Sequence, residues 1–220
     1  MSHGFTRGKT DQTLFIKREE DELLVAQVYI DDIIFGLTKD ELDHSFSKLM
    51  QAEFEISMIR ELTYFLGLQI HQQDSNIFLS QSKYAKNLVK KFGLEFASSV
   101  RTPMSLNVKF TVDLLGKSVD SSLYRSMIGS LFYLTASRPD ISYSVGVCAR
   151  YQANPKESHM IALKRIIKYV KTTADFGVRY SKYTNDVLAG YSDANWGWNT
   201  DDRNSTSRVV FMWIIILSPR

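Results

Sequence analysis

Two adjacent aspartates, Asp31 and Asp32, are the residues whose position most suggests chemistry. They interrupt an apolar stretch that runs from Leu23 to Phe35, so they are expected at a hairpin tip, where side chains leave the core. An ordinary turn explains one aspartate, because Asp is common in turns. Two neighbouring carboxylates repel each other, and a divalent cation such as Mg²⁺, held together with substrate phosphates, would relieve that repulsion. Spacing alone favours the plain turn and leaves the metal site open.

Tyr29 is the aromatic residue nearest to the two aspartates. In an extended strand successive side chains alternate between the two faces, which predicts Tyr29 and Asp31 on one face and Ile30 on the other. An aromatic ring beside a metal-binding carboxylate suits a site that handles nucleotides, because bases stack on aromatic rings. Tyr29 is therefore expected to line the same site.

Lysines recur at helical spacing in two places. Lys83, Lys86 and Lys90 follow the helix start expected at Ser82, and Lys164, Lys168 and Lys171 follow a second start signal that begins at Asn154. A helix face of this kind is most often simply solvated. It can also track the phosphate backbone of a nucleic acid, which lysines neutralise. Spacing alone does not decide between these two interpretations for either stripe.

Composition bounds the class of protein. The chain has 220 residues, 44% of them hydrophobic and 23% charged, which indicates a globular fold of one to one and a half domains. Its formal net charge of +3 permits a nucleic-acid partner without requiring one. The single cysteine, Cys148, cannot form an internal disulfide and is expected to be a small buried residue, so we expect a cytoplasmic or nuclear protein. The longest apolar run, 209–217, is about half of what spans a bilayer, and no membrane partner is expected.

The elements that must position these residues follow from hydrophobic periodicity, which predicts an α+β fold. Short apolar segments alternate with turn residues in the first third, the pattern then becomes helical, and it returns to strands after Gly177. Thr38 to Glu41 has the pattern of a capping box. The predicted strands are 14–17, 23–35, 64–71, 77–80, 178–181, 187–196 and 207–216, and the predicted helices begin near Thr38, Ser82, Leu123, Pro139 and Asn154, with residues 198–204 as a loop.

Several sequence blocks resemble one protein family. Tyr29-Ile30-Asp31-Asp32 resembles the Tyr-x-Asp-Asp box of reverse transcriptases, and the other blocks resemble, in order, the polymerase of copia-type LTR retrotransposons. These blocks are Gly4-Phe5-Thr6, Thr13-Leu14-Phe15, Phe65-Leu66-Gly67-Leu68-Gln69-Ile70, Ser80-Gln81-Ser82-Lys83-Tyr84, Thr102-Pro103-Met104, Tyr124-Arg125-Ser126-Met127-Ile128-Gly129-Ser130-Leu131, Ser137-Arg138-Pro139-Asp140-Ile141, Asn154-Pro155-Lys156-Glu157-Ser158-His159 and Gly190-Tyr191-Ser192-Asp193-Ala194.

The resemblance implies a role for each part of the chain. Residues 1–80 resemble the C-terminal part of a polymerase palm with a partial sheet, and their hairpin with Phe65, Leu66 and Gly67 resembles the primer grip. Residues 81–174 resemble a helical thumb, which favours nucleic-acid contacts for Lys83, Lys86 and Lys90. Residues 178–220 resemble the opening of an RNase H-like sheet, expected to be incomplete, in which Asp193 matches the first metal-binding carboxylate; without its flanking residues, Asp193 would be read as an aspartate in a turn.

The activity that the resemblance implies is RNA-directed DNA synthesis. Its partners would be an RNA/DNA template–primer duplex and deoxynucleoside triphosphates, and Mg²⁺ or Mn²⁺ would be held by Asp31 and Asp32, with Tyr29 beside them. The family's third carboxylate would precede residue 1, and Arg208 stands where the family usually has Gly. We therefore expect a truncated or degenerate copy that is inactive alone and binds metal weakly. The alternative expectation is a non-catalytic nucleic-acid-binding remnant of such an element.

Overall fold

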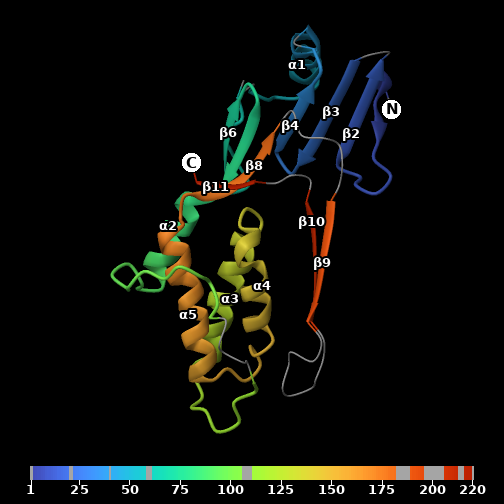
Figure 1. The fold of residues 1–220 in the computed structure, drawn as a ribbon. Helices are drawn as coiled ribbons and strands as arrows, with labels where there is room; N and C mark the ends of the chain where they lie inside the picture. Colours follow the sequence, from blue (N-terminus) through green and yellow to red (C-terminus); the bar gives the residue numbers. More distant parts are fainter. Residues whose placement is uncertain are drawn as a thin grey trace. The chain divides into compact units, whose positions relative to one another are not determined.

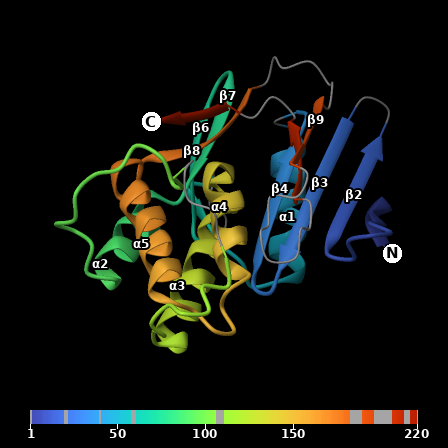
Figure 2. The same cartoon turned by 60° about the horizontal axis from the view of Figure 1, so that its bottom comes forward.

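The structure is a computed structural model that describes residues 2–19, 22–39, 41–57, 61–105, 111–181, 189–195, 206–212 and 216–219. The chain divides into two compact units, Met1–Glu61 and Leu62–Arg220, and both are drawn in Figures 1 and 2. Helices and antiparallel sheets occur in separate stretches of the chain, so the predicted α+β class is confirmed. None of the described helices is both long enough and apolar enough to cross a membrane.

The first unit is a four-stranded antiparallel sheet with one helix against it. After a short 3₁₀ turn, Ser2–Gly4, the strands β1 (Thr6–Arg7), β2 (Leu14–Glu19), β3 (Glu22–Tyr29) and β4 (Asp32–Leu37) pair in sequence order. The two-residue period of β3 buries Leu24 and Ala26 on one face. Helix α1 (Glu41–Glu53) packs Phe46 there, with its ring centroid 4.8 Å from that of Phe35.

The expected capping box at Thr38 is wrong. Helix α1 begins at Glu41, and the Thr38 hydroxyl accepts a hydrogen bond of 2.9 Å from the Leu23 backbone N–H. The Thr38 N–H also donates to the Leu23 carbonyl, at 3.1 Å. Thr38 thus continues the pairing of β3 with β4, and a side chain that pairs across a sheet is not free to cap a helix.

The second unit contains a five-stranded sheet that joins distant parts of the chain. The strands are β5 (Tyr64–Phe65), β6 (Leu68–Gln73), β7 (Asn76–Ser80), β8 (Phe176–Ser181) and β11 (Ile216–Pro219), and their spatial order is β11-β8-β7-β6-β5. Strand β8 lies antiparallel to β7, with Phe78 opposite Arg179. The first strand after the helices therefore returns to the sheet of residues 64–80.

Four helices separate β7 from β8 and hold the largest core. They are α2 (Ser82–Lys91), α3 (Ser121–Leu134), α4 (Pro139–Ala149) and α5 (Glu157–Thr172), and Figures 1 and 2 show them side by side. Their apolar faces follow the 3.6-residue period, so residues such as Leu131, Leu163 and Ile166 are fully buried.

The helix starts differ in detail from the expected ones. Gln81, not Ser82, is the N-cap of α2, and Lys156, not Asn154, is the N-cap of α5. At α5 the Lys156 N–H donates to Nδ1 of His159 at 3.0 Å. The buried histidine ring thus accepts the hydrogen bond that a Glu or Gln side chain accepts in a capping box.

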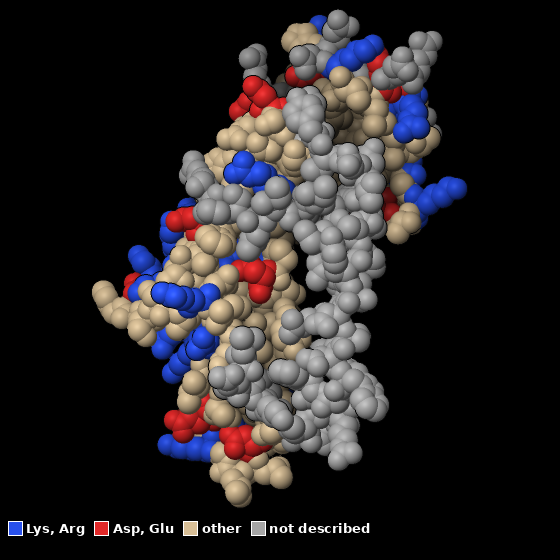
Figure 3. Space-filling view, in the orientation of Figure 1, with Lys and Arg blue, Asp and Glu red and all other residues tan. Residues whose placement is uncertain are grey.

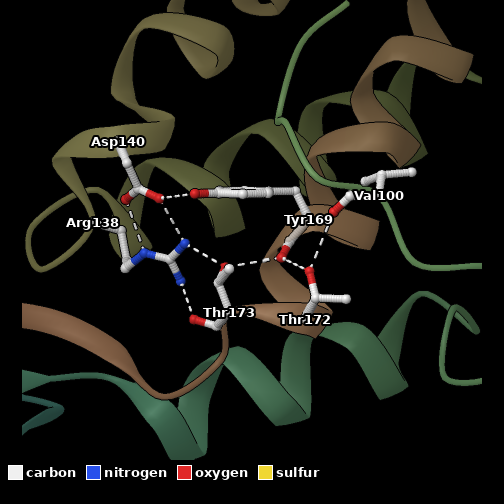
Figure 4. A network of polar contacts seen from close by, with 6 residues as sticks. All are labelled: Val100, Arg138, Asp140, Tyr169, Thr172 and Thr173. Carbon is white, nitrogen blue, oxygen red and sulfur yellow. Dashed lines mark hydrogen bonds and ion pairs between the residues drawn. The ribbon is translucent and has the colours of Figure 1, made fainter. Parts of the chain in front are cut away.

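A buried arginine links three elements of this unit (Figure 4). Arg138 precedes α4, is 1% exposed, and donates from Nη1 to the carbonyl of Thr173 and from Nη2 to its hydroxyl, both at 2.7 Å. Its guanidinium carbon lies 5.6 Å from the ring centroid of Tyr169 in α5 and 5.5 Å from that of Phe176 in β8. The start of α4, the end of α5 and the start of β8 therefore share one set of contacts.

The last described strands form a separate pair. Strand β9 (Ala189–Asn195) lies antiparallel to β10 (Thr206–Met212). The predicted single strand 207–216 is wrong, because β10 ends at Met212 and β11 pairs with β8 instead. The loop expected at 198–204 lies outside the described residues.

Candidate nucleic-acid and metal site

Asp31 and Asp32 lie at the tip of the β3–β4 hairpin. Tyr29 is paired directly with Asp32, so Ile30 and Asp31 form a two-residue turn. The prediction that Tyr29 and Asp31 share one strand face is wrong, because β3 ends at Tyr29 and the alternation stops there. Ile30 has φ of 53°, which a β-branched residue adopts only under strain. That backbone places two consecutive carboxylates at the exposed end of the hairpin.

An apolar groove lies beside this tip, within the first unit. Its volume is about 780 Å³, and the face of the sheet and helix α1 supply its walls, among them Phe15, Val28, Phe46 and Met50. Asp31 also lines the groove, and Tyr29 is 47% exposed. The hairpin tip thus combines charged oxygens, an accessible aromatic ring and an apolar surface.

The two carboxylates fit a loosely held divalent cation. Mg²⁺ is commonly bound by one or two protein carboxylates, with water and phosphate oxygens completing its octahedron, and Asp31 and Asp32 are exposed enough for that arrangement. Among the residues that the structure describes, no group of three or more His, Cys, Asp or Glu side chains could hold a metal ion. The described side chains therefore offer a partial set of ligands.

The β5–β6 hairpin holds the second group of predicted site residues. Phe65 pairs with Leu68, so Leu66 and Gly67 form a two-residue turn. Both have positive φ, 48° and 83°, as a type I′ turn requires. Leu66 is 45% exposed and Phe65 is half-buried. The Leu66 carbonyl accepts a hydrogen bond of 2.8 Å from the hydroxyl of Tyr133 in α3.

The first lysine stripe lies on the exposed face of α2, as predicted. Lys83, Lys86 and Lys90 are all exposed, and Figure 3 shows Lys and Arg gathered on the side where α2 and α5 lie. Nζ of Lys86 lies 2.7 Å from Oδ1 of Asp175. Lys83 and Lys90 form no ion pair with the described residues. Two of the three ammonium groups are therefore available to a polyanion.

The second lysine stripe is partly used within the fold. Nζ of Lys171 donates to the Ala97 carbonyl at 2.8 Å, and Nη2 of Arg165 donates to the Thr102 hydroxyl at 3.0 Å. These hydrogen bonds hold the segment that follows α2 against α5. Lys164 is exposed and Lys168 half-buried, so this face offers fewer cations than its spacing suggests.

Asp193, the remaining predicted metal ligand, lies in β9. The β9–β10 register places Arg208 directly opposite it. The metal role of Asp193 stays a prediction.

Comparison with known proteins bears on these two hairpins and on α2. Residues 1–106 match the model of the family described as reverse transcriptase (RNA-dependent DNA polymerase). The chain is 35% identical over 211 residues to the retrovirus-related Pol polyprotein from transposon RE2 of Arabidopsis thaliana, a match that covers 96% of this chain and 14% of the polyprotein. It is also 32% identical over 180 residues to an uncharacterized mitochondrial protein of the same plant, covering 82% of this chain and 75% of that protein.

The chain belongs to the copia-type retrotransposon reverse transcriptase family. The Pol polyprotein from transposon RE1 of the same plant is 33% identical to it over 210 residues, covering 96% of this chain. The chain spans 14% of the length of these two polyproteins. No solved structure matches it.

The surroundings of Cys148 disfavour a role as a nucleophile. Its side chain is fully buried, and that burial raises the pKa of its thiol to about 12. A thiol that stays protonated is a poor nucleophile. The expectation of a small buried residue is confirmed.

Other residues around the family's hairpins have no signal in the sequence. Tyr133 contacts the Leu66 turn, Gln69 accepts from the first turn of α2, and Asp175 neutralises Lys86. Each acts on a residue far away in the chain. Gly67 is the exception, since the resemblance places it in the hairpin and a glycine is favoured where a turn requires positive φ.

Proposed function

We propose that residues 1–220 form part of the polymerase of a retrotransposon reverse transcriptase, an RNA-directed DNA polymerase. The observation that carries this proposal is the tip of the β3–β4 hairpin, where Tyr29 faces Asp32 across the turn and both carboxylates are exposed. The family membership supports it, because the matched residues 1–106 include this hairpin.

In this proposal Asp31 and Asp32 hold Mg²⁺ or Mn²⁺ together with the phosphates of a deoxynucleoside triphosphate. When bound, the cation stabilises charge on the attacking and leaving oxygens of phosphoryl transfer. The protein's own contribution is to place two acceptor side chains side by side on a two-residue turn, where the developing charge is expected. The ring of Tyr29 offers a surface beside the carboxylates for the incoming nucleotide.

The remaining parts take the roles that the resemblance implies. Residues 1–80 act as palm with a primer-grip hairpin, residues 81–174 as thumb, and residues 178–220 as the opening of an RNase H-like part. The template–primer duplex lies along α2, whose Lys83 and Lys90 are exposed and unpaired among the described residues. Such a protein works in the cytoplasm or nucleus.

The second candidate is a non-catalytic nucleic-acid-binding remnant. It is favoured by the ligand count, because the described residues gather fewer than three possible metal ligands anywhere, while the polymerase reaction uses two metal ions. Residues 1–220 on their own would then bind a primed duplex and leave it unextended. We take this as the behaviour of the isolated chain, and the polymerase role as that of a chain supplied with a further carboxylate.

A primer-extension assay separates the two candidates. An RNA template annealed to a DNA primer is incubated with the chain, deoxynucleoside triphosphates and Mg²⁺ or Mn²⁺. We expect a bound but unextended primer. Template-dependent extension that Asp31→Asn abolishes would show that the chain is a polymerase by itself. Asp74→Asn is the matched control, because Asp74 is an exposed carboxylate at another hairpin turn.

A further inference from the structure

The turn at Leu66 and Gly67 is attached to helix α3 by one side chain. The hydroxyl of Tyr133, in the last turn of α3, donates a hydrogen bond of 2.8 Å to the Leu66 carbonyl. That carbonyl lies at the outermost point of a two-residue hairpin, where no strand partner can donate a hydrogen bond to it. Tyr133 therefore takes the place of the missing partner.

The contact with Tyr133 leaves no room for a side chain at position 67. A Cβ atom added at Gly67 would overlap the hydroxyl oxygen of Tyr133, and φ of 83° there already disfavours a side chain. Leu66 adopts φ of 48°, an uncommon conformation for a residue other than glycine. A strained turn persists only where its surroundings hold it, and Tyr133 is the residue that does so.

Tyr133 is itself fixed by the helices. Its ring meets the ring of Tyr84 edge-on, with centroids 4.8 Å apart at 69°. Its carbonyl accepts from Nε2 of Gln81 at 3.4 Å, and Oε1 of that buried amide accepts from the Ser137 hydroxyl at 2.7 Å. Tyr133 is 45% exposed, but the contact with Tyr84 and the hydrogen bond to its backbone carbonyl restrain it from the helix side, and a restrained side chain can position a neighbour.

The hairpin has a second attachment at its base. Oε1 of Gln69 in β6 accepts a hydrogen bond of 2.9 Å from the Lys83 N–H, in the first turn of α2. The hairpin is thus tied to α3 at its tip and to α2 below it. This leaves the exposed side chains of Tyr64 and Leu66, 57% and 45% exposed, presented on a rigid support.

We infer that Tyr133 is a positioning residue for nucleic acid: it holds the Leu66–Gly67 turn so that Tyr64 and Leu66 contact the 3′-terminal nucleotide of a primer strand. The inference rests on the proposed function, which supplies the duplex. An aromatic and an apolar side chain on a fixed turn offer a stacking surface to the outer face of a terminal base, which has no neighbouring base on that side. The hydroxyl of Tyr133 touches no nucleotide and acts only through the turn.

The first arm of the test needs no nucleic acid. Tyr133→Phe keeps the ring and its packing and removes the hydroxyl, so the amides of Phe65 and Leu68 that flank the turn should exchange with solvent about fivefold faster, the factor for one neutral hydrogen bond. Tyr180→Phe removes an exposed hydroxyl from β8 of the same sheet and should change neither amide. Unchanged exchange in Tyr133→Phe would overturn the inference.

The second arm uses an RNA template annealed to DNA primers that carry 2-aminopurine either at the 3′ end or well upstream. The wild-type chain should change the fluorescence of the terminal probe, and Tyr133→Phe should make that change about twofold smaller by loosening a stacking contact, with the affinity for the upstream-labelled duplex unaltered. An equal terminal signal in the two proteins, or no terminal signal in a wild-type chain that binds, would overturn the inference. A wild-type chain that binds neither duplex would instead overturn the proposed function.

Discussion

Arg138 and Asp140 form a bidentate ion pair inside the helical region: Nε donates to Oδ1 at 2.9 Å and Nη2 donates to Oδ2 at 2.8 Å. The side chain of Arg138 is 1% exposed and that of Asp140 is 14% exposed. The Tyr169 hydroxyl also donates to Oδ2 of Asp140, at 2.9 Å, and burial, aided by the charge of Asp140, raises the pKa of that phenol. The phenol therefore stays a donor throughout the neutral range.

Loss of this pair should destabilise the helical region strongly. Asp140→Asn leaves the buried Arg138 cation without its charge partner, so we expect the free energy of unfolding to fall by about 3–5 kcal/mol. The control is Asp175→Asn, which breaks the exposed pair with Lys86 and should cost less than about 1 kcal/mol. Urea unfolding followed by circular dichroism measures both values. Equal losses in the two variants would show that the buried Arg138–Asp140 pair stabilises the fold no more than the exposed Lys86–Asp175 pair does.

Hydrogen exchange should be slowest in the helices of the second unit. Fully buried residues from α3, α4 and α5 share one core, while the first unit buries only Leu24, Ala26 and Phe46 among its described residues. Amides of the largest core open only on global unfolding. We therefore expect protection to concentrate between Tyr84 and Tyr169. Equal or greater protection in residues 13–36 would show that the β2–β4 sheet is the more stable part.

Manganese should bind at the β3–β4 hairpin. Mn²⁺ is paramagnetic, so titration should broaden the amide signals of residues 29–33 first, and the double variant Asp31→Asn/Asp32→Asn should lose that broadening, because neutral amides bind hard cations poorly. Asp74→Asn, at the exposed β6–β7 turn, should leave it unchanged. Broadening that persists in the double variant would place the cation elsewhere.

Local patterns in the sequence predicted most of the elements. Strands near 14–17 and 77–80 lie where periodicity placed them, because burial of one face dominates the choice of structure. The single strand predicted for 64–71 is wrong, because the turn at Leu66 and Gly67 divides it into β5 and β6. The N-caps of α2 and α5 lie one residue before and two residues after the expected positions, since helix boundaries are the least sharply defined part of a helix. The hairpin with Asp31 and Asp32 was expected, but not the left-handed Ile30, a residue type that rarely adopts such a conformation.

Long-range contacts had no local signal. Tyr133 and Leu66 are 67 positions apart, and Lys86 and Asp175 are 89 apart. The pairing of β8 with β7 likewise joins residues on either side of four helices. Such contacts depend on how whole elements pack, which periodicity within one segment does not report.

The salt dependence of duplex binding tests most directly whether α2 is a nucleic-acid surface. Three free lysines would give a slope of log K against log salt near −3, at about −0.9 per phosphate neutralised. Since Lys86 is paired with Asp175, we expect about −1.8 from Lys83 and Lys90 on B-form DNA, or about a tenfold loss of affinity between 50 and 200 mM salt.

The decisive measurement is a fluorescence titration of a labelled duplex at these two salt concentrations. Lys83→Ala/Lys90→Ala should shallow the slope by about 1.8, Lys86→Ala should change it less, and the charge-matched control Lys9→Ala/Lys48→Ala, at exposed positions of the first unit, should leave it unchanged. Alanine keeps helix propensity high, so α2 should stay folded. Undetectable binding at 50 mM salt, or the wild-type slope in Lys83→Ala/Lys90→Ala, would show that the α2 face is only solvated surface.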